Sequence, residues 1–405
     1  MSKKLSVAIV GAGVGGLASA LFLRRLGHAV TLFERFAAPQ PIGAGLLLQP
    51  TGLAVLRALG LYEAAVRQGA RIDRLDGRTR NGRTVIDMRY RDLAPDYFGL
   101  GIHRGFLFQV LFDAVQSGDI GLITNCEITR FEPGPDVRLT DTHGKQYAGF
   151  DLAVFSDGSD SPARAAAGIV RRDRPYRWGA VWSICPAPNI RSPDVLRQVY
   201  NGPRQMAGIL PVGRLQPSDP PLVSLFWSLH ADEFEAWRRR GLAAWKDEMQ
   251  AYWPDYAALL HSIVDLQQLT PARYRDVVLQ RPDIGNVVFI GDAAHAMSPQ
   301  LGQGANLALI DAKVLAAAVA DALGHGGTIE QATARYARLR RSHVGYYQLA
   351  SRWLTPVFQG RSRTIGWMRD VFMAPAGRLP VIKRHTLATL VGTKSGIFRI
   401  MQSLP

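Results

Sequence analysis

Hydrophobic and polar positions form blocks along the chain, and the first blocks predict a βαβ unit. Residues 5–10 are mostly apolar, as in a strand buried on both faces of a parallel sheet. Residues 14–26 carry apolar side chains at helical spacing, and residues 29–33 form a second β-rich run. The chain therefore opens like a nucleotide-binding domain.

Later blocks predict an inserted sheet and a helical end. Alternating runs at 74–80 and 83–88 flank Asn81-Gly82, a favoured two-residue hairpin turn. The pattern from 176 to 268 is again rich in strands, and it becomes helical after about 305. We predict an α/β fold in three parts: a discontinuous, Rossmann-like nucleotide domain (1–72, 100–175 and 276–345), a β-sheet substrate domain inserted into it (73–99 and 176–275), and a helical C-terminal region (346–405).

A glycine-rich loop joins the first strand to the first helix, and its spacing is typical of dinucleotide-binding sites. Gly11 allows a tight turn, Gly13 lets the backbone approach a pyrophosphate, and Gly16 lets helix and strand pack closely. Glu34 ends the second strand, where a carboxylate can accept hydrogen bonds from ribose hydroxyls. The alternative is a strand-to-helix turn that binds nothing.

A second glycine-punctuated segment lies 280 residues later. Strand 287–290 runs into Gly291-Asp292, and a loop at 299–304 starts a helix at about Ala305. The first amides of a helix have no intrahelical partner and attract anions. Two such sites, each following a strand, predict one long anionic cofactor held from both sides.

Bulk composition limits the remaining possibilities. The chain has 405 residues, is 47% hydrophobic and has only Cys126 and Cys185, too few for a disulfide framework and wrongly spaced for a metal site. We therefore expect no metal and a reducing compartment, the cytoplasm. No apolar stretch approaches the roughly 20 residues of a membrane span.

The net charge is +15, and only 7 of the 48 basic residues are lysine. The chain carries no DNA- or RNA-binding signature, so we expect no nucleic-acid partner. Scattered arginine favours a solvated surface; an anionic lipid or an acidic aromatic substrate are the alternatives.

Three motifs stand in a fixed order: the glycine loop with Glu34-Arg35, the segment 157–164 (DGSDSPAR), and the segment 291–306. Together they resemble the single-component FAD-dependent aromatic hydroxylases with the p-hydroxybenzoate hydroxylase fold, over about residues 1–345. The resemblance implies an FAD-dependent monooxygenase that uses NADH or NADPH and O2. Through a C4a-hydroperoxyflavin it would hydroxylate an aromatic ring, phenolic, hydroxypyridine, quinolone or quinone-like.

The resemblance also assigns residues. Asp292 would hold a ribityl hydroxyl, Arg104 would contact the flavin, and Pro299 would line the flavin edge beside the substrate, while His295 looks structural. Plain alternatives are a simple turn at Asp157-Gly158 and a surface ion pair for Arg104. The expected cofactor-binding residues are Gly11, Gly13, Val14, Gly15, Gly16, Glu34, Arg35, Arg104, Asp157, Gly158, Arg164, Gly291, Asp292, Gly302, Gly304, Ala305 and Asn306.

Alternation along 222–230 gives two faces, one with Phe226 and the other with Trp227, and one of them must meet the flavin. His230 ends this strand and is a candidate to deprotonate a phenol, which makes it, with Pro299, the expected catalytic pair. Ordinary core packing is the alternative for each residue. The expected substrate-binding residues are Trp182, Met206, Leu210, Phe226 and Trp227.

The last sixty residues combine tryptophans with many arginines. They could cap the pocket, pair subunits or lie on a membrane surface, so a monomer or a homodimer and a peripheral membrane contact stay open. Competing functions are an FAD-dependent oxidoreductase or dehydrogenase without oxygen insertion, and a non-catalytic nucleotide sensor. A halogenase is disfavoured because Trp178 and Trp182 do not match its WxWxIP motif.

Overall fold

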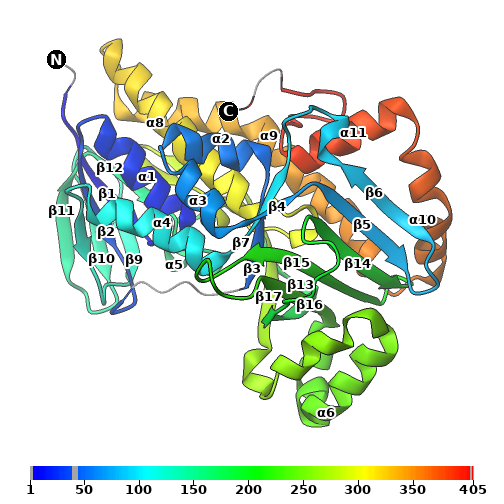
Figure 1. Ribbon diagram of the computed structural model, residues 1–405. Coiled ribbons are helices and arrows are strands. Elements are labelled where there is room, and N and C mark those ends of the chain that lie inside the picture. Colours follow the sequence, from blue (N-terminus) through cyan, green and yellow to red (C-terminus); the bar gives the residue numbers. More distant parts are fainter. Residues whose placement is uncertain (1–2, 39–43, 402–403, 405) are drawn as a thin grey trace.

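The computed structural model describes residues 3–38, 44–401 and 404. Its framework is a six-stranded sheet, parallel except at one edge (Figure 1). In spatial order the strands are β18 (Asp283–Ile284), β19 (Val287–Phe289), β12 (Leu152–Phe155), β1 (Ser6–Val10), β2 (Ala29–Phe33) and β8 (Gly121–Ile123). β1 lies between β12 and β2, so the predicted glycine loop leaves the middle of the sheet.

The two faces of this sheet are covered differently. Apolar helix faces cover one side, with α1 and α8 in a shared core. A three-stranded sheet covers the other side. The helices are α1 (Val14–Arg25), α2 (Pro50–Ala58), α4 (Arg104–Gln116) and α8 (Gly304–Gly324), with α3 (Tyr62–Gln68) beside them, and the small sheet is β9 (Ile128–Glu132), β10 (Val137–Asp141) and β11 (Gln146–Phe150).

The second large sheet of the protein has seven strands. The hairpin around Asn81-Gly82 lies at its edge, because β5 pairs in parallel with β14. In order the strands are β17 (Thr270–Leu279), β13 (Val170–Pro186), β16 (Leu222–His230), β15 (Gln205–Gly213), β14 (Val195–Asn201), β5 (Arg74–Thr79) and β6 (Thr84–Arg89).

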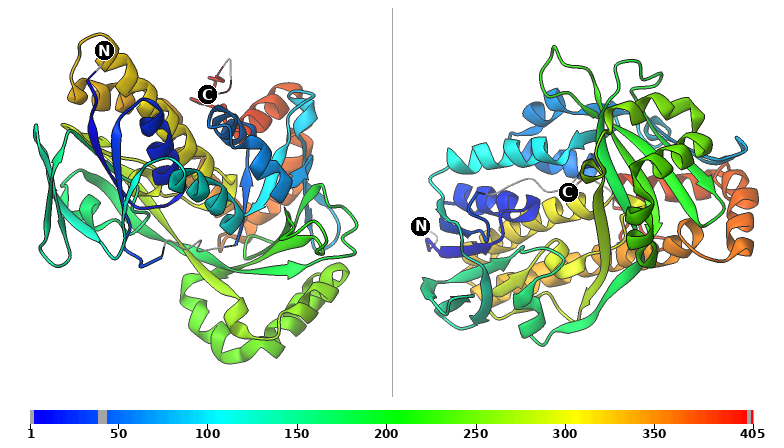
Figure 2. Two further views of the ribbon diagram at one scale, coloured as in Figure 1. Left: turned by 60° about the vertical axis from the view of Figure 1, so that its left-hand side comes forward. Right: turned by 90° about the horizontal axis from the view of Figure 1, so that it is seen from below.

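Two long strands of the seven-stranded sheet, β13 and β17, reach toward the six-stranded sheet, and β17 contacts the segment Asp292–His295 (Figure 2). β13 and β17 pair with each other, and their register shifts between Pro175 and Gly179. The boundaries predicted at 175/176 and 275/276 fall inside these strands. A third sheet, of β3 (Gly45–Leu48), β7 (Gly99–His103) and β4 (Ala70–Ile72), also packs against β15.

Helices cover both faces of the seven-stranded sheet. One face carries α6 (Phe234–Tyr252), which lies at the bottom of Figure 1. The opposite face carries the C-terminal helices α9 (Ile329–Phe358), α10 (Arg363–Ala376) and α11 (Pro380–Val391). The predicted α/β class, with an inserted sheet and a helical C-terminal region, is confirmed.

Candidate cofactor and substrate site

The glycine loop after β1 has the geometry that its spacing predicts. Gly11 has a φ of +98°, and an added Cβ would lie 2.7 Å from the Ser156 carbonyl oxygen. A Cβ on Gly16 would clash with the carbonyl oxygen of Gly11, whereas one on Gly13 would meet nothing closer than 3.9 Å. α1 begins at Val14, and its N-cap residue, Gly13, has no side chain to cap it, so the first amides of the helix face this open space.

Glu34 is fixed at this loop. Its buried carboxylate accepts hydrogen bonds from the amides of Ala12 (2.9 Å) and Phe36 (3.0 Å). Arg35 is half exposed, 3.9 Å from a carboxylate oxygen of Glu127. Glu34 therefore faces the nucleotide site, and Arg35 lies at the surface.

The first and third motifs meet on helix α8. An added Cβ on Gly15 would lie 3.3 Å from the Ala308 side chain, and one on Gly291 would lie 3.2 Å from it. α8 starts at Gly304 without a side-chain cap, and the exposed Asp292 carboxylate lies beside this start. Two bare helix starts thus converge on one site, as expected for a long anionic ligand.

The side chain of Asn306 is committed to the protein. Its amide nitrogen donates to the carbonyls of Leu47 (3.1 Å) and Gly302 (2.9 Å), and its oxygen accepts from the Gln49 amide (2.8 Å). The contact predicted between this segment and the cofactor is one of the backbone amides after Gly302, and it stays a prediction. Asn306 ties the loop before α8 to strand β3.

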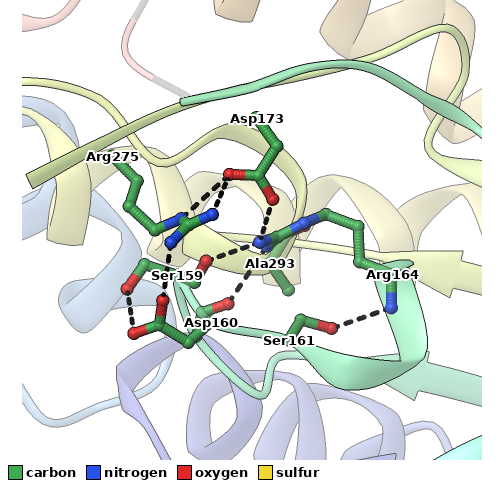
Figure 3. Close-up of polar contacts among 8 residues, drawn as sticks. Ser159, Asp160, Ser161, Arg164, Asp173, Arg275 and Ala293 are labelled. Carbon is green, nitrogen blue, oxygen red and sulfur yellow. Dashed lines mark hydrogen bonds and ion pairs between the residues drawn. The ribbon is translucent and has the colours of Figure 1, made fainter. Parts of the chain in front are cut away.

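Arg164 joins the second motif to the third. It is 1% exposed, and its guanidinium donates to the carbonyls of Ala293 (3.2 Å) and Ser159 and to Asp173 (2.8 Å), which Arg275 also binds (Figure 3). These bonds position the second motif against the third, and the predicted contact of Arg164 to the cofactor stays a prediction.

Asp157 differs from its neighbours in that its carboxylate lacks a hydrogen-bond partner among the residues described. Both carboxylate oxygens are buried without a hydrogen-bond partner in the described part of the chain. Burial raises the pKa of this carboxyl to about 6. Asp157 follows Ser156, which packs against Gly11, so the orphan carboxylate lies beside the glycine loop. Hydroxyl donors of a ligand would satisfy it.

A second buried carboxylate, Asp311 of α8, supports the Gly291 turn. It accepts from the Gly291 amide (2.9 Å), lies 2.6 Å from His295 Nε2 and accepts from Arg340 (2.6 Å), which in turn contacts His343. Burial alone would raise the pKa of Asp311, but the charges of His295 and Arg340 hold it well below its usual range. His295 therefore helps to hold the Gly291 turn, and the structural role that the resemblance implies for it stays a prediction.

Arg104 is the first residue of α4 and is exposed. Among the residues that the structure places, no carboxylate lies within ion-pair distance of it. The neighbouring His103 caps the helix by accepting from the Gly105 amide at 3.1 Å. The guanidinium is thus available to a ligand.

The face of β16 that carries Phe226 contacts the nucleotide domain. Ser224, two residues away on the same face, accepts a hydrogen bond from the Gly45 amide of β3 (3.0 Å). The Phe226 ring lies 5.0 Å from that of Trp182 and clusters with Met206 and with Phe358 of α9. Leu210 shares this face but packs with Leu47 and α11.

Trp227 was predicted for the same pocket, and this is wrong. Successive side chains of a strand point to opposite faces, so Phe226 and Trp227 cannot share one. Trp227 packs beneath α6, 6.5 Å from Trp245 and 5.1 Å from Tyr252 between ring centres. It belongs to the core of the inserted domain.

His230 and Pro299 lie in adjoining parts of the site. His230 is 4% exposed; its Nδ1 accepts weakly from the Asp232 amide (3.4 Å), and its Nε2 lies 3.5 Å from Arg361. Pro299 is exposed, and the next residue, Gln300, donates to Gln359 (2.6 Å) of the segment that carries Arg361. The contribution of residues 358–361 was missed, because nothing in their local pattern signals that they return to this site.

A family model described as an FAD binding domain matches residues 4–345. The chain belongs to this FAD-binding family.

Relatives extend the likeness over most of the chain. Aurachin C monooxygenase/isomerase of Stigmatella aurantiaca is 28% identical, over 92% of this chain and 94% of that protein. The 3-amino-4-hydroxybenzoate 2-monooxygenase of Streptomyces cremeus is 32% identical, over 84% of each. The structure of Klebsiella pneumoniae HpxO with FAD and uric acid has a TM-score of 0.79 at 20% identity, covering 96% of this chain and 97% of that one, and shows the shared fold.

The site fits the FAD that this family binds. The open space at Gly13, the two uncapped helix starts and the orphan carboxylate of Asp157 are all groups that a nucleotide would complete. The predictions of an FAD cofactor and of an FAD-dependent monooxygenase of the aromatic hydroxylase group are confirmed.

Proposed function

We propose that this monooxygenase hydroxylates a planar, largely apolar aromatic ring, using NADH or NADPH and O2. The ring would be phenolic, hydroxypyridine, quinolone or quinone-like; the Streptomyces cremeus relative is named for a phenolic substrate. The observation that carries the proposal is the apolar face of Trp182, Met206 and Phe226, which joins the nucleotide domain beside β3. Such a face suits a flat ring better than a charged or sugar-like ligand.

Bound FAD would supply the redox chemistry, and the chain would supply position and field. The glycine loop, Glu34, Asp157, Asp292 and the start of α8 would hold the cofactor. The apolar face would keep water from the reacting atoms, which suppresses wasteful release of hydrogen peroxide. The exclusion of water from the reacting atoms supports oxygen insertion over the dehydrogenase alternative.

His230 is our proposed base for a phenolic proton. It ends the strand that carries Phe226 and lies on the same face of the sheet. Nε2 can take up a proton only when the ring carries its hydrogen on Nδ1, so the weak bond to the Asp232 amide would have to break. We expect His230→Gln to lower kcat most for substrates with a high phenol pKa.

A substrate panel tests the proposed function. Phenolic, salicylate-like, hydroxypyridine and quinolone compounds are added to the FAD-loaded protein, and NAD(P)H consumption and products are followed. At least one compound should stimulate consumption and yield a hydroxylated product. Stimulated consumption with only hydrogen peroxide as product, across the whole panel, would contradict the proposal.

Peripheral membrane contact is a further part of the proposal. Ten of the sixteen exposed large apolar side chains in the described residues lie between Trp353 and Phe398, including Trp367 (60%) and Phe372 (55%) on α10. Helix α10 lies at the right-hand edge of Figure 1. The segment 353–405 has eight basic residues and one acidic residue. That charge opposes a second copy on the same face and favours an anionic lipid surface. No helix among the placed residues could cross a bilayer.

We therefore propose a cytoplasmic protein, monomeric or homodimeric, that touches the membrane surface through 353–398. Nucleic acid has no part in this proposal.

A further inference from the structure

An arginine-lined groove lies between strand β13 and the end of helix α9. Its larger lobe, about 580 Å³, and a smaller lobe of about 310 Å³ share Arg172, Arg174 and Arg352. The two lobes together are lined by six arginines and by a single carboxylate, that of Asp276. The lining arginines are Arg171, Arg172, Arg174, Arg177, Arg352 and Arg361.

The one carboxylate of the groove already forms ion pairs within the protein. Asp276 is 3% exposed and pairs with Arg172 (2.5 Å) and with Arg352 (3.0 Å). The other four arginines have no carboxylate within 4.0 Å among the residues described. The groove therefore carries a large excess of positive charge without an internal counterion.

Two donors in the groove are buried and unsatisfied. Nη2 of Arg352 and the hydroxyl group of Tyr176 have no hydrogen-bond acceptor within the described chain. Buried donors of this kind are rare in folded proteins, and each costs free energy until an acceptor arrives. Both side chains line the larger lobe, so an oxygen-rich ligand there would satisfy them.

The strand geometry favours a built site. The register between β13 and β17 shifts from Pro175 to Gly179, and Tyr176, Arg177 and Trp178 of this irregular stretch line the groove. Such irregularities re-aim side chains and are common beside active sites. The aromatic residues offer stacking surface next to the cations.

The groove reaches the turn predicted to lie at the flavin edge. Gln359 lines it and accepts the hydrogen bond from Gln300, the neighbour of Pro299. A ligand that binds its charged part in the groove would thus have its other end close to the cofactor site.

We infer that this groove binds the phosphate groups of the nicotinamide dinucleotide. The inference rests on the proposed function, which requires that co-substrate. Guanidinium groups bind phosphate oxygens in pairs, and a pyrophosphate, with or without a 2′-phosphate, carries enough charge for several arginines. A single substrate carboxylate would need only one of them.

The test uses the FAD-loaded full chain and direct titration calorimetry with NADP⁺ and NAD⁺. The double variant Arg174→Gln/Arg177→Gln is compared with Arg239→Gln, which removes an exposed arginine of α6 that lies outside the groove. We expect Kd to rise at least tenfold in the double variant and to stay unchanged in the control. Added salt should weaken binding more in the unmodified protein than in the double variant.

Reduction of the flavin without oxygen gives a second readout. The NAD(P)H concentration for half-maximal rate should rise in the double variant, while the limiting rate, FAD content and melting temperature stay the same. Unchanged dinucleotide affinity would overturn the inference, and so would a rise confined to the KM of the aromatic substrate. Because calorimetry needs no turnover, the result stands apart from whether any aromatic compound is hydroxylated.

Discussion

Asp311 and Asp157 are both buried carboxylates beside the glycine loops, yet one has three partners and the other has none. The pKa of Asp311 is held well below its usual range, whereas burial raises that of Asp157 to about 6. The Asp311 carboxylate is hydrogen-bonded by the protein itself, and within the described chain the Asp157 carboxylate is not. The difference separates scaffold from binding site more clearly than residue type does.

The largest expected effect on stability comes from removing the charge of Asp311. Asp311→Asn leaves Arg340 buried with a neutral partner, and we expect the free energy of unfolding to fall by about 3–5 kcal/mol. Denaturant titration measures it. Asp321→Asn on the same helix removes a partly exposed pair with Arg335 and should cost under ~1 kcal/mol. Similar losses of unfolding free energy in the two variants would show that the buried Asp311 contributes no more than an exposed ion pair.

A substitution at Asp157 is expected to raise the free energy of unfolding rather than lower it. In the folded protein the Asp157 carboxyl prefers its proton, so its contribution to stability is complete below about pH 4 and is lost as pH rises through about 6. Asp157→Asn should therefore stabilise the FAD-free protein by about 3 kcal/mol at pH 8 and by less than ~1 kcal/mol at pH 4.

The same substitution should weaken FAD binding, because a carboxylate accepts hydrogen bonds from hydroxyls better than an amide does. Fluorescence titration of the FAD-free protein with FAD gives the affinity. A variant that is less stable at pH 8, or that binds FAD as tightly as the unmodified protein, would mean that Asp157 is not a ligand-completed group.

The pH dependence of stability tests the cluster around Asp311 through His343, which contacts Arg340. Burial and then the charge of Arg340 lower the pKa of His343 to about 3, so the folded state keeps it neutral. Its contribution to stability is present above the unfolded value of 6.5 and is lost as pH falls toward 3, by about 2 kcal/mol at pH 5. His343→Gln should flatten the fall in stability between pH 7 and pH 5. An unchanged slope would show that other groups dominate it.

The smallest expected effect concerns membrane binding at the surface, where apolar side chains of α10 are exposed to water. Trp367→Ser should weaken flotation with vesicles of phosphatidylglycerol and phosphatidylcholine about tenfold at low salt. Val264→Ser, which removes an apolar side chain that is 77% exposed elsewhere, should not. If Trp367→Ser instead converts a dimer to a monomer in light scattering, a second copy covers this face.

Local pattern was enough to predict the βαβ unit and both glycine loops. Each depends on neighbours in sequence: an apolar run, a turn that excludes a Cβ at Gly11, and an uncapped helix start. The meeting of Gly15 and Gly291 on Ala308 was implied only because both loops follow parallel strands of one sheet.

The substrate face could not be assigned in the same way. All nine residues of β16 are buried, so alternation carries no contrast between an inner and an outer face. Whether α6 or the C-terminal helices cover Trp227 depends on contacts distant in sequence. The side chains of Arg164 and Asn306 show a similar limit, since residue type alone does not reveal the hydrogen bonds that they make within the protein.

Oxygen transfer tests the central claim most directly. A substrate that stimulates NAD(P)H consumption is turned over under ¹⁸O₂, and the product is weighed by mass spectrometry. An aromatic hydroxylase predicts one ¹⁸O atom in each product molecule and none when the label is in water. A product without the label from dioxygen would contradict the monooxygenase assignment.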